Sequence, residues 1–87
     1  MMKYWIAKKV FNQEIKKYEF LVVGNDSFST LRKAVLFAEK NGFNKESEIQ
    51  AAINTGECNF YLLSEWQDDT TSKTVKYEPY PVINADI

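Results

Sequence analysis

The sequence predicts an α+β domain, with an antiparallel sheet of about four strands and two helices on one of its faces. Apolar residues recur at helical spacing in a central stretch, 27–42, and short aromatic or β-branched runs lie on either side of it. The connections between these runs are short, which favours hairpins over crossovers. The expected order is therefore β-β-α-α-β-β, and we expect residues 1–87 to form a single domain.

Two strands are expected before the central stretch. Residues 4–10 are rich in aromatic and β-branched side chains, and residues 18–23 read YEFLVV. This second run is nearly continuous in apolar residues, as is typical of a central strand rather than an edge strand. The polar segment 12–17 between the two runs suits a hairpin turn, and the polar run 24–26 is expected to end the second strand.

Two helices are expected next, over 27–42 and roughly 45–55. The first has a broad apolar face, with acceptable N-cap residues at Asp26, Ser27 and Ser29 and a stop at Gly42. The second has a narrower stripe, formed by Ile49, Ala52 and Ile53. Its expected caps are Asn44 or Ser47 at the start and Gly56 at the end.

The C-terminal part of the sequence predicts two more strands. Residues 57–67 form the third strand, 68–72 a solvated turn, and 73–78 a half-buried fourth strand. Pro79 and Pro81 are expected to end the pairing, because proline lacks the backbone N–H that a ladder requires. Residues 82–87 are expected to be a loose tail.

Composition argues against catalysis. The chain has no histidine, which removes histidine-based catalytic arrangements and most zinc sites. Cys58 is the only cysteine and is expected to be a small buried core residue. Asp68 and Asp69 are expected to form a turn rather than bind a cation, and no phosphate-binding glycine motif is present. We therefore expect no catalytic residue, no cofactor and no metal ion.

Location and charge give further expectations. A single cysteine and the absence of a long apolar run predict a cytoplasmic protein that does not contact a membrane. Residues 1–45 carry a net charge of +5 and residues 46–87 carry −6, which together give −1. The two halves either neutralise each other in the fold or present a basic face and an acidic face.

The predicted binding surface is the sheet face away from the helices. Strand alternation sends Ile6 and Val10 toward the helices, together with Phe60 and Leu62 of the third strand. The residues between them then share the open face as candidate partner-binding residues: Trp5, Lys9, Phe11, Tyr61 and Leu63, with Lys76 as a further candidate. This face can bind a protein, including a second copy in a homodimer, can stack RNA bases, or can be covered by the tail.

In style, the chain resembles small accessory proteins encoded by bacteriophages and mobile elements. The resemblance is carried by the hairpin YWIAKKV…YEFLVV, the helix SFSTLRKAVLFAEKNG, the strand NFYLLSEW and the histidine-free composition. It implies a non-enzymatic inhibitor or modulator that binds a host protein or protein complex in the host cytoplasm. The alternative is an RNA-binding protein, or an RNA-dependent inhibitor similar to an antitoxin, that uses the basic N-terminal half.

Overall fold

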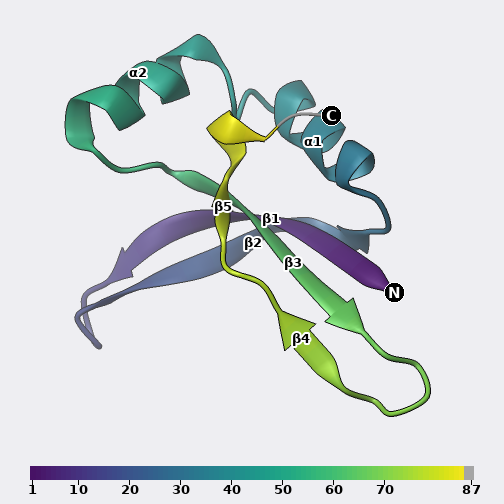
Figure 1. The fold of residues 1–87 in the computed structure, drawn as a ribbon. Coiled ribbons are helices and arrows are strands. Elements are labelled where there is room, and N and C mark those ends of the chain that lie inside the picture. The colour runs from purple at the N-terminus through teal and green to yellow at the C-terminus, as the bar shows by residue number, and fades with distance from the viewer. Residues whose placement is uncertain (86–87) are drawn as a thin grey trace.

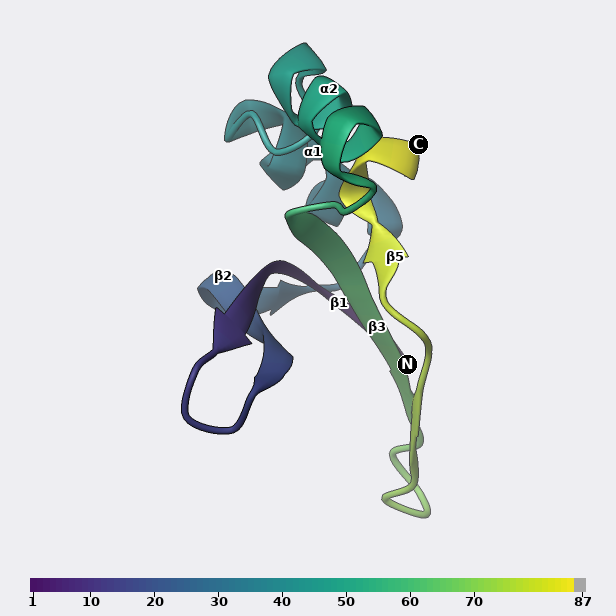
Figure 2. The ribbon, with the colours of Figure 1, turned by 90° about the vertical axis from the view of Figure 1, so that its left-hand side faces the viewer.

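A computed structural model gives the structure of residues 1–85 and confirms the α+β class, with five antiparallel strands and two α-helices (Figure 1). The elements in chain order are β1 (Met2–Asn12), β2 (Lys17–Phe28), α1 (Leu31–Lys40), α2 (Glu46–Thr55), β3 (Phe60–Gln67), β4 (Thr74–Lys76), β5 (Tyr80–Pro81) and a short 3₁₀ helix, η1 (Val82–Asn84). The sheet order is β2-β1-β3-β4, and β5 also pairs with β3. Both helices lie on one side of the sheet, as predicted (Figures 1 and 2).

The β1–β2 hairpin is longer than expected, because the polar run 24–26 does not end the second strand. The β1–β2 register shifts between Tyr4, which pairs with Phe28, and Ile6, which pairs with Val23. The residues between Val23 and Phe28 form a bulge, and Gly24 adopts a φ of +92° that favours glycine. The predicted break is therefore a bulge, after which β2 continues to Phe28.

Because β2 extends so far, α1 begins at Leu31 rather than at Ser27. Its N-cap is Thr30, whose side-chain oxygen accepts a hydrogen bond from the Lys33 backbone N–H at 3.2 Å. The predicted caps Asp26, Ser27 and Ser29 all precede this position. The last helical residue is Lys40 and Gly42 follows in the left-handed conformation, so the predicted end of this helix is accurate to two residues.

The second helix, α2, lies where the sequence placed it and ends at Gly56 in the left-handed conformation, as expected. Neither predicted N-cap is used: Lys45 precedes the first turn, and no side chain caps it. Gln50 instead donates to the Glu46 carboxylate at 3.3 Å. Ile49 and Ala52 are half-buried while Ile53 is exposed, so α2 buries less than its sequence pattern predicts.

The core lies between α1 and the helix-facing side of the sheet. Buried residues from four elements meet there: Ile6, Ala34, Ala38, Leu62 and Val82. Val82 belongs to η1, so the prediction of a loose tail over 82–87 is wrong for residues 82–84, which form η1 against the core. Residues 86–87 lie outside the described residues. The prediction that the prolines end the pairing is wrong for Pro81, which lies in β5 opposite Tyr61, whereas Pro79 lies between β4 and β5.

Candidate functional site

The pairing register places all five predicted binding residues on the same face of the sheet, opposite α1. Ile6 and Leu62 are register partners, and both are buried in the core on the helix side. Their strand neighbours therefore point to the other side, because successive side chains of a strand alternate between faces. The residues brought together there are Trp5, Lys9, Phe11, Tyr61 and Leu63.

The structure adds three residues of β2 that the sequence analysis missed. Tyr18 pairs with Phe11, Phe20 with Lys9, and Val22 with Ala7. The run YEFLVV is apolar at nearly every position, so its alternation did not reveal which side chains face outward. Only the pairing register, in which Asn12 lies opposite Lys17, shows which of these side chains face outward. We call the complete set the open face: Trp5, Lys9, Phe11, Tyr18, Phe20, Val22, Tyr61 and Leu63.

Exposure is uneven across the open face. Trp5, Lys9, Tyr61 and Leu63 are half-buried, whereas Phe11, Tyr18, Phe20 and Val22 are 43%, 50%, 37% and 48% exposed. These four exposed residues all lie on the β1–β2 hairpin, which Figure 1 shows extending away from the helices. The accessible apolar surface is therefore concentrated on the hairpin, and most of it comes from β2.

The aromatic rings of the open face form two edge-to-face pairs around one lysine. Phe11 and Tyr18 have ring centroids 5.1 Å apart, and Phe20 and Tyr61 have centroids 5.2 Å apart. The Lys9 ammonium lies between them, 4.6 Å from the Tyr18 centroid and 5.7 Å from that of Tyr61. Such contacts favour a cation over the ring and fix the ring positions. The result is an ordered apolar surface with one positive charge near its centre.

Trp5 and Leu63 lie at the other end of the open face, next to β4. Together with Glu65, Lys76 and Pro79 they line a shallow groove of about 290 Å³. Lys76 pairs with Glu65 in the β3–β4 ladder, so this further candidate is also on the open face. The groove extends the apolar surface of the hairpin toward a mixed-charge rim.

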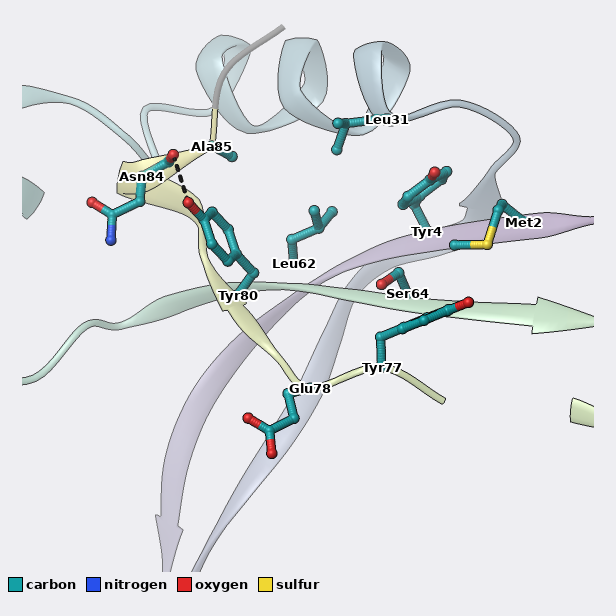
Figure 3. A pocket seen from close by; sticks show the side chains of 10 residues that line it. All are labelled: Met2, Tyr4, Leu31, Leu62, Ser64, Tyr77, Glu78, Tyr80, Asn84 and Ala85. Carbon is teal, nitrogen blue, oxygen red and sulfur yellow. Dashed lines mark hydrogen bonds between the residues drawn. The ribbon is translucent and has the colours of Figure 1, made fainter. Parts of the chain in front are cut away.

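A second groove lies on the helix side of the sheet and was not predicted (Figure 3). It has a volume of about 640 Å³ and a mainly apolar lining, which includes Tyr4, Leu31, Leu62 and Tyr80. The Tyr80 hydroxyl donates to the Asn84 carbonyl at 3.2 Å, which ties β5 to the end of η1. This groove shares Ser64 and Tyr77 with the groove beside Trp5 and Leu63.

Two other residues singled out in the sequence, Cys58 and Asp68, lie outside the open face as defined above. Cys58 is half-buried, not a core residue as expected. Asp68 accepts hydrogen bonds from the Thr70 backbone N–H at 2.9 Å and the Thr70 hydroxyl at 2.8 Å, which lower the pKa of this carboxyl to about 2. Among residues 1–85, no group of three acidic, cysteine or histidine side chains is placed to hold a metal ion.

In the described part of the chain, neither helix is both long and apolar enough to cross a membrane. Comparison with known proteins finds no family model, no curated protein and no solved structure that matches this chain.

Proposed function

We propose that this protein is a non-enzymatic binding protein that contacts a partner protein through the open face. The observation that carries the proposal is the exposure of Phe11, Tyr18, Phe20 and Val22 side by side on two paired strands. Contiguous apolar surface in water is unfavourable, and on small domains it commonly marks an interaction site. Aromatic side chains are also enriched among the residues that contribute most to protein–protein affinity.

Ring geometry favours a protein partner over RNA. Bases stack flat on open aromatic faces, whereas the rings here are engaged edge to face with each other. Lys9 lies over the Tyr18 ring, which occupies a face that a base would need. A net charge of −1 also provides little attraction for phosphate groups.

The chemistry of the sequence supports a binding role without catalysis. The chain has no histidine, and its single cysteine, Cys58, lies on the segment before β3. From the resemblance to phage-encoded accessory proteins, we propose that the partner is a host protein and that this chain inhibits or modulates it. Binding through an exposed surface is enough for such a role, because occupying a functional surface of the host protein blocks it.

The test is affinity capture from host cells with three tagged proteins: wild type, Phe11→Glu and Val75→Glu. Phe11 lies on the open face, whereas Val75 is a similarly exposed residue that pairs with Trp66 on the opposite face. We expect a stoichiometric protein with wild type and Val75→Glu that is absent with Phe11→Glu. Captured nucleic acid that resists high salt and disappears with nuclease would instead support RNA binding. A partner retained by Phe11→Glu and lost by Val75→Glu would contradict the proposal.

A further inference from the structure

We infer that two copies of this chain pair through β2, as antiparallel edge strands centred on Leu21. Within residues 1–85, β2 is the terminal strand of the sheet and pairs only with β1. Its other edge therefore presents backbone N–H and C=O groups that a further strand can bind. This inference does not depend on the proposed function.

The segment 18–23 of β2 has few of the features that usually protect an edge. Natural edge strands are short, or carry charged side chains, especially lysine, or contain proline or a bulge. Residues 18–23 contain no lysine and no proline, and the register shift lies beyond Val23. The one charged residue, Glu19, accepts a hydrogen bond from the Asn12 amide of β1 at 3.2 Å. Side chains are exposed on both faces of this segment. Phe20 and Val22 lie on the open face, and Leu21, which lies on the other face, is also exposed. This segment of β2 therefore has the composition of a central strand although β2 lies at the edge of the sheet.

Backbone directions show which residues would bond to the added strand. The Lys9 backbone N–H donates to the Asn59 carbonyl at 2.8 Å, so odd-numbered residues of this part of β1 direct their backbone groups toward β3. Even-numbered residues such as Lys8, which pairs with Leu21, then bond to β2. Phe20 and Val22 consequently direct their own N–H and C=O groups to the open edge.

A second copy fits this edge in one favourable register. With Leu21 facing Leu21 of the other copy, Phe20 faces Val22 and Glu19 faces Val23, so apolar side chains meet across the dyad. A register centred on Phe20 would bring the two Glu19 carboxylates to diagonal positions, and one centred on Glu19 would place them directly opposite. Two identical antiparallel strands are related by a two-fold axis perpendicular to the sheet, so the two open faces would join on one side.

Disulfide trapping tests the register directly. Leu21 is a non-hydrogen-bonded position at the dyad, where the facing Cα atoms are about 4.5 Å apart, which is within the range for a disulfide. In a Cys58→Ser background, we expect Leu21→Cys to form a covalent dimer on mild oxidation. Val75→Cys is the matched control, because Val75 is 52% exposed and Leu21 is 53% exposed. Equal cross-linking of the two variants would overturn the inference.

A second measurement uses the mass of the untrapped protein. Val22→Pro removes an N–H that faces the open edge and leaves the β1–β2 ladder intact, whereas Val22→Thr keeps it. Light scattering should show dimers for wild type and Val22→Thr and monomers for folded Val22→Pro. The inference would be overturned if the wild-type protein were monomeric at every concentration. This holds even if its β2 edge binds a strand of another protein. Phe11→Glu should still form the Leu21→Cys cross-link, which separates this test from that of the proposed function.

Discussion

Val35 is the residue whose replacement tests the buried side of α1 most directly. It lies in α1 and is 2% exposed, so an aspartate there would place an unpaired charge in the interior. We expect Val35→Asp to lower the free energy of unfolding by about 4 kcal/mol or more. A chain of 87 residues has roughly 4–13 kcal/mol in total, so the variant should be largely unfolded by circular dichroism.

The adjacent residue provides the control for this prediction. Leu36 lies in the same helix but is 42% exposed, so Leu36→Asp adds the same charge at the surface. Its free energy of unfolding should stay within about 0.5 kcal/mol of wild type. Similar thermal unfolding of the two variants would contradict the burial of Val35.

Asp68 makes stability dependent on pH in the acidic range. Hydrogen bonds from Thr70 lower its pKa from 3.8 to about 2 in the folded protein, so the unfolded chain binds a proton more readily. The stabilisation is fully present above pH 3.8 and is lost as the pH falls toward 2. Asp68→Asn should therefore flatten the stability profile between these values in denaturant titrations. An unchanged slope in that window, with Asp69→Asn as the charge control, would contradict this account.

At the scale of elements, η1 is the part whose role differs most from expectation. Val82 is 1% exposed and completes the core beside Ile6 and Leu62. Val82→Ala should lower the free energy of unfolding by about 2 kcal/mol, through lost apolar burial and the cavity left behind. Denaturant unfolding would measure this loss. Asn84→Ala is the control, since the exposed Asn84 contributes a backbone carbonyl to Tyr80, and it should unfold like wild type.

The elements that sequence predicted best were those with a strong local period. The apolar spacing of α1 and the glycine that ends α2 were enough to place both helices to within a few residues. The prediction was wrong where pairing overrode local preference. The polar run after Val23 stays in β2 because its continuation pairs with β1 beyond the bulge, so Thr30 becomes the helix cap. Likewise, no local pattern showed that Val82 would reach the core.

For the whole molecule, the candidate site was predictable as far as strand alternation could be read. The parity of β1 and β3 was clear from Ile6 and Leu62, and it placed the five predicted residues on one face. The contribution of β2 could not be predicted in this way, because both of its faces are apolar. The most exposed residues of the open face, Tyr18 and Val22, therefore became visible only with the register. Which strand lies at the edge also follows from pairing rather than from composition.

The affinity of the captured partner for two tyrosine variants tests the central claim, that the open face is the binding surface. Tyr18 is 50% exposed on the open face, and Tyr80 is 49% exposed and lines the groove on the helix side. Calorimetric titration should show that Tyr18→Ala weakens binding at least tenfold, about 1.4 kcal/mol, while Tyr80→Ala binds like wild type. Unchanged affinity for Tyr18→Ala with a comparable loss for Tyr80→Ala would contradict the account and place the binding surface on the helix side.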